Sequence, residues 1–333
     1  MKQKRRGAIF LALVLLAGAA GADLIGLTDD PLTIGGGARP LGMGRAVAAG
    51  ADDADAIFIN PGGLALMKRP QAMALSTNLL AGDVYYSEFC GAVPSVFGSV
   101  GIGYITTGVN RISTLAGSTE VFTDYYDSVL AFSYASGLSR FVQYADNVFV
   151  GLNLKLFNRG FTGGLNQTSS GFSSDFGLKY IVSPYLNLAL VRQNFIPFSL
   201  GAGLHSSGGL EEALAGETRL ALAAKPLPFD GKLLLAADLD IPAQSGQPVT
   251  EHLGGEWKVS PNLALRLGLD QSLDSETPGG TGWNPAFGTS FNYGGFRMDY
   301  AFHPYYNDPA LATTYFSLSY TGEPWLALKG RVE

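Results

Sequence analysis

Apolar side chains recur at every second position along most of the chain, which is the period of a β-strand. Segment 262–271 is the clearest case, because leucine stands at positions 263, 265, 267 and 269, with polar or small residues between. Segments 97–107, 146–158 and 295–303 show the same alternation. Each such strand has one apolar face and one face that mixes glycine, small and charged residues.

The same pattern predicts fourteen strands of about ten residues, the length that a tilted strand needs to cross a bilayer. They are expected at 71–80, 84–93, 97–107, 124–134, 146–158, 171–182, 185–194, 216–225, 231–240, 249–259, 262–271, 283–293, 295–303 and 312–320. An even number of strands is typical of bacterial outer-membrane barrels.

The connections between these strands alternate between short turns and longer loops, and the longest loops are expected at 108–123, 159–170 and 195–215. Outer-membrane barrels have short periplasmic turns and longer extracellular loops. The strands of a soluble β-sandwich also alternate apolar and polar residues, but the apolar faces of its two sheets must be buried against each other. A closed barrel in lipid satisfies every backbone hydrogen bond and turns the apolar face outward. We therefore expect an all-β fold, a transmembrane antiparallel β-barrel over 71–320.

The composition narrows the class of protein further. The chain is 47% hydrophobic and 15% charged, with 44 glycines, a net charge of -6 and one cysteine. So few charges exclude a disordered chain, and the negative balance excludes a basic nucleic-acid binder. One cysteine cannot form a disulfide framework or a thiolate metal site within the chain.

Residues 1–22 have the pattern of a secretory signal peptide. Four basic residues lie within positions 2–6, an apolar run follows from Ala8 to Ala20, and Ala20-Gly21-Ala22 is a cleavage pattern. A membrane anchor, the alternative, requires about 20 apolar residues. We therefore expect an exported chain.

Residues 23–70 are expected to lie inside the barrel. A barrel of fourteen strands is wider than its own side chains fill, so its lumen holds either water or another segment. This stretch is rich in glycine and alanine, and Asn60-Pro61 would end a helix sharply. Asp52, Asp53 and Asp55 lack the spacing of a calcium loop, which favours a helix N-terminus or partners for lumen bases.

The same stretch resembles a known family through Ala38-Arg39, Met43-Gly44, Ala46, Asp52-Asp53, Ala56, Asn60-Pro61 and Gly63-Leu64-Ala65. In this order and spacing, they are similar to the N-terminal signature of PorV/PorQ-type proteins and of the wider FadL superfamily of outer-membrane barrels. The resemblance implies a fourteen-stranded barrel with an N-terminal hatch. It places the hatch motif at Met43, Gly44, Asp52, Asp53, Asn60, Pro61 and Leu64. Arg45 stands where the family commonly has glycine.

Charged residues of both signs are expected to face the lumen. They are Asp127, Lys155, Asp175, Lys179, Arg219, Asp238, Glu256, Arg266, Arg297 and Asp299. An unpaired charge is costly in a water-poor lumen, so one interpretation is that they pair with one another and with the hatch. The other is that some of them line a permeation path and set its selectivity.

Two functions compete at this point, both within an outer-membrane barrel in contact with lipid. The first is a PorV/PorQ-type accessory for protein export or surface attachment, with exported cargo or secretion-system components as partners. The second is a FadL-like passive channel for small hydrophobic molecules. In that channel Phe195, Ile196, Phe198 and Leu200 would capture the ligand. A barrel that only acts as a scaffold is a third possibility.

An enzyme is not expected. His205, His252 and His303 lack metal-binding spacing, and Cys90 stands among strand residues as a packing residue. No catalytic residue, metal or cofactor is therefore assigned. The last expected strand, 312–320, resembles a barrel assembly signal, which normally stands at the extreme C-terminus. Here a tail, 321–333, follows it.

Overall fold

The chain forms a closed antiparallel β-barrel around its N-terminal segment. This computed structural model describes residues 27–28, 31, 35–79, 82–116, 118–273, 280–304 and 312–324. The expected signal peptide and residues 325–333 of the expected tail lie outside these residues. No helix within the described residues is both long enough and apolar enough to cross a membrane.

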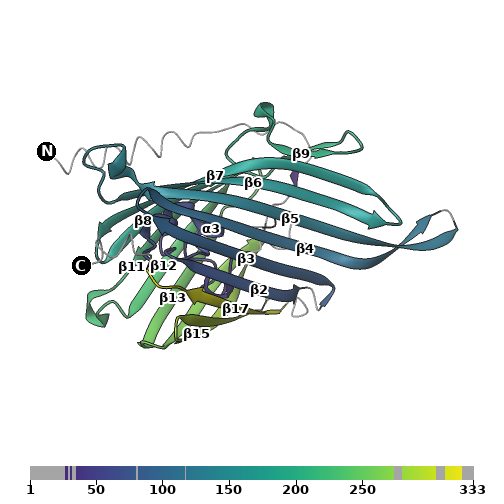
Figure 1. Ribbon diagram of the computed structural model, residues 1–333. Coiled ribbons are helices and arrows are strands. Elements are labelled where there is room, and N and C mark those ends of the chain that lie inside the picture. Colours follow the sequence, from purple (N-terminus) through teal and green to yellow (C-terminus); the bar gives the residue numbers. More distant parts are fainter. Residues whose placement is uncertain are drawn as a thin grey trace.

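Fourteen strands of the described chain make the barrel wall, which confirms the predicted number. They are β2 (Gln71–Leu79), β3 (Val84–Ser95), β4 (Gly98–Ala116), β5 (Thr119–Gly137), β6 (Val148–Gly163), β7 (Gln167–Ser183), β8 (Leu186–Gln193), β11 (Glu217–Ala224), β12 (Leu233–Pro242), β13 (Thr250–Ser260), β14 (Leu263–Leu273), β15 (Thr281–Tyr293), β16 (Phe296–His303) and β17 (Thr313–Thr321). Each strand pairs antiparallel with the next, β8 pairs with β11, and β17 pairs with β2 to close the barrel (Figure 1).

Side chains alternate across the wall as the sequence pattern predicts. In β14, Leu265, Leu267 and Leu269 are 44%, 63% and 43% exposed, whereas Arg266 and Asp270, on the opposite face of the strand, are buried. The apolar face therefore lies on the outside of the barrel and the polar face on the inside. This arrangement excludes the β-sandwich, which would bury the apolar face.

The predicted loops at 108–123 and 159–170 are wrong, because both stretches are mostly strand. The β4–β5 ladder continues to the pair Ala116 and Thr119, and the β6–β7 ladder continues to Phe161 and Gln167. In Figure 1 these four strands reach well beyond the others at one end. A strand that projects from the wall is solvated on both faces, so its sequence loses the alternation that identifies the others.

We call this end the distal rim, and the end at which β2 begins and β17 ends the terminal rim. The predicted loop at 195–215 crosses the distal rim and contains a hairpin, β9 (Gly203–Ser206) and β10 (Glu211–Leu214). Strand β9 pairs with β7, and β10 pairs with β1 (Leu27–Thr28). Strands of four residues are too short for an alternating pattern to reveal.

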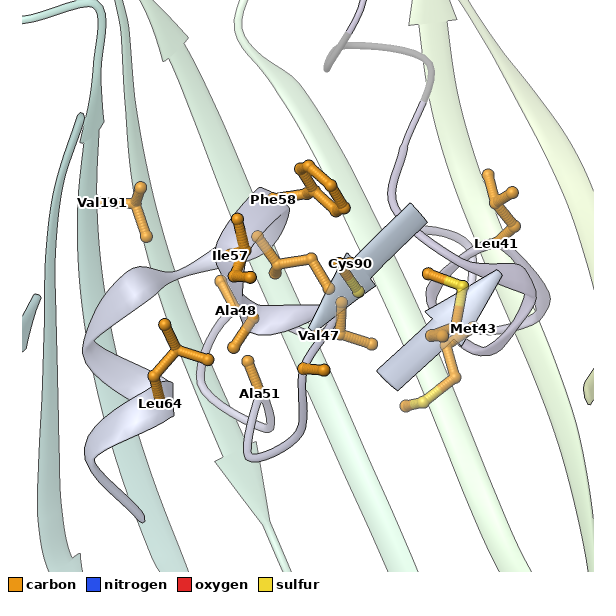
Figure 2. Close-up of a cluster of buried hydrophobic side chains, with 14 of the residues drawn as sticks. Leu41, Met43, Val47, Ala48, Ala51, Ile57, Phe58, Leu64, Cys90 and Val191 are labelled. Atoms are coloured by element: carbon orange, nitrogen blue, oxygen red, sulfur yellow. The ribbon is translucent and has the colours of Figure 1, made fainter. Parts of the chain in front are cut away.

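The N-terminal segment, defined here as residues 35–70, lies inside the barrel. It contains α2 (Ala38–Gly42), α3 (Ala56–Ile59) and the 3-10 helix η2 (Pro61–Leu66). Helix α2 contacts β14 to β17, and η2 contacts β3 to β7. The segment therefore crosses the lumen from one side of the wall to the other, and its apolar side chains form a buried cluster between the strands (Figure 2).

Candidate functional site: the occupied lumen

Glycines let the N-terminal segment approach the wall closely. A Cβ on Gly42 would lie 3.0 Å from the Cα of Gly288 on β15, closer than Cβ atoms normally come. A Cβ on Gly254 would meet the carbonyl of Met43, and one on Gly268 would meet the backbone of Gly44. The predicted hatch residues Met43 and Gly44 thus lie against wall positions that have no side chain.

The opposite wall has the same feature. A Cβ on Gly151 of β6 would meet Pro61, and one on Gly177 of β7 would lie 2.7 Å from the Cδ of Pro61. Leu64 of η2 is fully buried (Figure 2). Contacts with backbone on both sides fix the position of the segment between the two walls.

Asn60 connects three parts of the structure through one buried side chain. Its Oδ1 accepts a hydrogen bond from the Gly62 amide at 3.0 Å, which caps η2. Its Nδ2 donates to the carbonyls of Ala48 at 2.9 Å and Leu178 at 3.4 Å. The Asn-Pro element therefore both starts η2 and links the segment to β7.

Arg45 has a left-handed backbone with φ of 67°. Glycine adopts this region without strain, whereas arginine rarely does. The Arg45 guanidinium Nη1 lies 3.9 Å from Asp270 Oδ1. The additional charge thus faces a carboxylate of the wall.

Arg39 of α2 joins the segment to β13. Its Nε donates to Glu256 Oε2 at 3.1 Å, and its Nη1 lies 3.1 Å from Asp53 and 3.2 Å from Asp52. Glu256 also accepts from Arg266 Nε at 2.8 Å. This carboxylate is therefore shared between a cation of the segment and a cation of the wall.

Arg297 of β16 makes the converse contact, from the wall to the segment. Its Nη1 lies 3.0 Å from Asp53 Oδ2, and its Nε donates to Asp299 Oδ2 at 2.7 Å. Arg266 Nη1 lies 3.0 Å from the other oxygen of Asp299. Arg297 Nη2 also lies 3.7 Å from Asp55 Oδ2. We call the eight residues that make these contacts the latch cluster: Arg39, Asp52, Asp53, Asp55, Glu256, Arg266, Arg297 and Asp299.

Within the latch cluster, Asp53 and Asp55 differ in protonation. Burial alone would raise the pKa of Asp53, but the charges of Arg297 and Arg39 outweigh it and hold the pKa below its usual range. Burial, followed by the negative charge of Asp53, raises the pKa of Asp55 to about 8. Asp55 therefore carries a proton at neutral pH and lies next to the Cys90 thiol, whose Sγ is 3.8 Å from Asp55 Oδ1.

A second buried set follows the wall from β11 to β16, and we call it the histidine cluster. Arg219 Nε donates to Asp240 at 2.5 Å, and the second oxygen of Asp240 lies 3.2 Å from His252 Nε2. His252 Nδ1 lies 2.6 Å from Asp270, whose other oxygen lies 3.0 Å from His303 Nε2. Basic and acidic groups thus alternate without interruption across the inner wall.

The spacing of the histidines along the chain does not indicate this cluster. The barrel brings them together through register, since Arg219 lies opposite Asp240 and His252 lies opposite Asp270. These residues all stand at strand positions that face the inside of the barrel, and this is the one sequence feature that indicates the cluster.

The ten predicted lumen residues all make a polar contact within the barrel. Nine are buried, and Arg297 is half-buried. Besides the clusters above, Lys155 lies 2.8 Å from Asp175, Lys179 Nζ donates to the Ala51 carbonyl at 2.6 Å, and Asp127 accepts from Arg159 at 2.7 Å. Asp238 accepts from the Val47 and Ala48 amides at 3.1 and 2.9 Å. These contacts fit the interpretation that the charges pair with one another and with the segment.

The four loop residues expected to capture ligand do not share one environment. Phe195 and Leu200 are 36% and 71% exposed, whereas Ile196 and Phe198 are half-buried. The ring of Phe198 stacks on His205 with centroids 5.7 Å apart. The distal rim therefore presents Phe195 and Leu200 to their surroundings.

Comparison with known proteins gives structural neighbours but no sequence relatives. No family model matches the chain, and no curated protein matches it. The monoaromatic hydrocarbon channel CymD superposes with a TM-score of 0.62 at 13% identity, over 87% of this chain and 98% of that one. The toluene transporter TbuX of Ralstonia pickettii gives 0.59 at 13% identity over the same shares, and a FadL homologue of Pseudomonas aeruginosa gives 0.52 at 12% over 86% and 98%. The chain is therefore similar in fold to FadL-type outer-membrane barrels.

Proposed function

We propose that the protein is an outer-membrane channel for small hydrophobic molecules, with the N-terminal segment as its hatch. One observation carries the proposal: the segment fills the lumen of a closed barrel whose fold is shared with CymD and TbuX, a monoaromatic hydrocarbon channel and a toluene transporter. These neighbours favour the channel over the export accessory that the sequence analysis placed first.

The outer surface of the barrel supports a location in the outer membrane. Many outward side chains of the wall are apolar and of the kind that lipid solvates. Each of the fourteen described wall strands is paired on both sides, so no unpaired edge among them faces lipid. The expected signal peptide would export the chain. Together they support the outer membrane as the site of action.

The latch cluster indicates that the described state is closed. Arg39 and Arg297 hold Asp53 from two sides, so the segment cannot leave the wall without separating buried charges. Removing one partner of a buried ion pair costs about 3–5 kcal/mol. A passage for small apolar molecules therefore requires a rearrangement of the segment that keeps or replaces these pairs.

Uptake of labelled toluene by cells that carry or lack the gene tests the function. We expect deletion to slow uptake and the plasmid-borne gene to restore it, while uptake of a small sugar stays the same in all strains. Equal toluene uptake with and without the gene would exclude the channel.

A disulfide between the segment and the wall tests the hatch. A Cβ on Gly42 would lie 3.5 Å from the Cβ of Ala301 on β16, which is within the range for a disulfide. We expect the oxidised double variant Gly42→Cys/Ala301→Cys to lose toluene uptake and to recover it after reduction.

Each single variant, Gly42→Cys and Ala301→Cys, serves as a control for the added side chain. Uptake by either single variant should be the same under oxidising and reducing conditions. If the oxidised double variant transports as well as the reduced one, the segment does not move during transport.

One observation favours the export accessory as a second candidate. The β4–β5 and β6–β7 hairpins project beyond the distal rim and expose Leu115 and Leu165, which are 76% and 51% exposed. Apolar side chains on projecting strands suit contact with another protein. Co-purification of exported cargo with the wild-type protein, lost when the projecting parts of both hairpins are shortened, would support this function.

A further inference from the structure

A cavity of about 660 Å³ lies inside the terminal rim, outside both charge clusters. It is bounded by the end of η2, by the β3–β4 turn and by the connection from β5 to β6. Its size is that of a site for a small molecule.

One part of the cavity lining is apolar. Leu66 and Met67 contribute from the end of η2, Val96 contributes from the β3–β4 turn, and Phe149 contributes from β6. Hydroxyl groups of serines, among them Ser99 and Ser136, complete the wall. An apolar group of a ligand could therefore pack against this part of the lining.

The charges in the lining are all of one sign. Lys68 and Arg140 line the cavity, and among its described lining residues there is no carboxylate. Arg140 Nη2 donates a hydrogen bond to the Val96 carbonyl, and its guanidinium lies over the Phe97 ring at 5.8 Å from the centroid. These contacts hold the Arg140 side chain against the β3–β4 turn, which bounds the cavity. A guanidinium has further N–H groups to donate.

We propose that this cavity binds an amphiphile with one anionic head group and an apolar tail. Lys68 and Arg140 bind the head group through charge-assisted hydrogen bonds, and the tail covers Leu66, Met67 and Phe149. A neutral hydrocarbon would use only the apolar part of the lining, and a small inorganic anion would use only the cations. Leu66 and Met67 belong to the N-terminal segment, but the proposal requires only the described position of the segment and not its movement. It therefore goes beyond the channel function and fails or stands separately from it.

Two sources can supply this chemistry, a free carboxylate such as a fatty acid or an anionic phospholipid of the surrounding membrane. The test uses the full mature chain in nanodiscs of neutral phosphatidylcholine, with labelled dodecanoate as the probe and dodecanol as its uncharged counterpart. We expect Lys68→Met and Arg140→Met each to weaken dodecanoate binding about tenfold, because each removes a hydrogen bond to a charged group. Dodecanol binding should change less than twofold.

Lys232→Met is the matched control, because Lys232 is an exposed lysine at the same rim that does not line the cavity. It should leave the binding of both probes unchanged. Ser139→Trp places a ring in the cavity from an exposed position and should weaken both probes. Heat-modifiable migration on a gel checks that every variant forms its barrel.

Nanodiscs that contain phosphatidylglycerol distinguish the two sources. If that lipid displaces dodecanoate from the wild type and from Lys232→Met but not from Arg140→Met, a membrane lipid is the occupant. If it does not displace dodecanoate, a free amphiphile is the occupant. Dodecanoate binding that is unaffected by both charge variants, or by Ser139→Trp, would overturn the proposal.

Discussion

At the scale of single residues, Asp53 and Asp55 show how position inside the barrel decides the charge of a carboxyl group. Both are buried in the N-terminal segment. Asp53 lies between Arg39 and Arg297, at 3.1 and 3.0 Å, and its pKa is lowered although burial opposes this. Asp55 is 3.7 Å from Arg297 and next to the charge of Asp53, and its pKa is raised to about 8.

The raised pKa of Asp55 predicts a pH dependence. Its ordinary pKa is 3.8, so the folded state binds the proton more tightly than the unfolded state. The resulting stabilisation is complete below the ordinary pKa and is lost as the pH rises through about 8. We expect faster amide hydrogen exchange in residues 51–60 of the wild type than of Asp55→Asn at about pH 9, and similar exchange at about pH 6.

Asp53→Asn is the contrasting variant, because it removes a charge that the structure uses. We expect it to loosen residues 51–60 at both pH values, by about 3 kcal/mol, since Arg39 and Arg297 each lose a buried partner. If Asp55→Asn loosens the segment as much as Asp53→Asn at about pH 6, Asp55 is charged there and the assignment is wrong.

At the scale of elements, contact between backbones holds the N-terminal segment against β13 and β14. Gly254 and Gly268 lie opposite each other in the ladder and face inward onto Met43 and Gly44. The neighbouring Gly255 faces outward, and the nearest atom to a Cβ there would be 3.6 Å away. Adjacent glycines of one strand therefore have different roles.

This difference predicts unequal effects of one substitution. We expect Gly254→Ala to displace the segment and to increase hydrogen exchange in residues 42–50, because its methyl group would overlap the Met43 carbonyl. Gly255→Ala should leave exchange in these residues unchanged. Equal effects of the two variants would mean that the backbone contact does not hold the segment.

At the scale of the whole molecule, the apolar belt of the barrel requires lipid around it. Leu267 and Leu273 both belong to β14 and are 63% and 60% exposed, but Leu267 lies mid-strand and Leu273 ends the strand at the distal rim. A charge costs most at the midplane of a bilayer and little near its surfaces.

Leu267→Arg should therefore destabilise the barrel in bilayers by about 2–4 kcal/mol, and Leu273→Arg by about 0–1 kcal/mol. Equilibrium unfolding from phospholipid vesicles in guanidinium measures both. Similar costs for the two variants would contradict the position of the belt, because the cost would then not depend on depth.

Alternation made the fold predictable. Most wall strands carry apolar residues on the outer face and polar or small residues on the inner face, so positions such as Leu265 and Arg266 carry the period of the strand. The alternating pattern does not extend to the projecting parts of β4 to β7, where it predicts loops, or to the short hairpin of β9 and β10.

The candidate site was predictable only in part. The alternation of each strand predicts that residues such as Glu256 and Arg297 face the lumen. It does not predict their partners, because Arg39 and Glu256 are 217 positions apart in the chain. The histidine cluster depends on strand register, which places His252 opposite Asp270, and on the reach of His303 from β16 to the same carboxylate. The alternating pattern gives the face of a residue but not its partner across the strands.

By itself, the sequence determined which face of each strand meets lipid and that a glycine-rich segment remained to fill the lumen, because both follow from local composition and period. Only the tertiary structure decided which charges meet, which aspartate keeps its proton, and where Lys68 and Arg140 come to line one cavity. These properties arise from distances across a closed barrel, and closure brings together residues that the chain keeps apart.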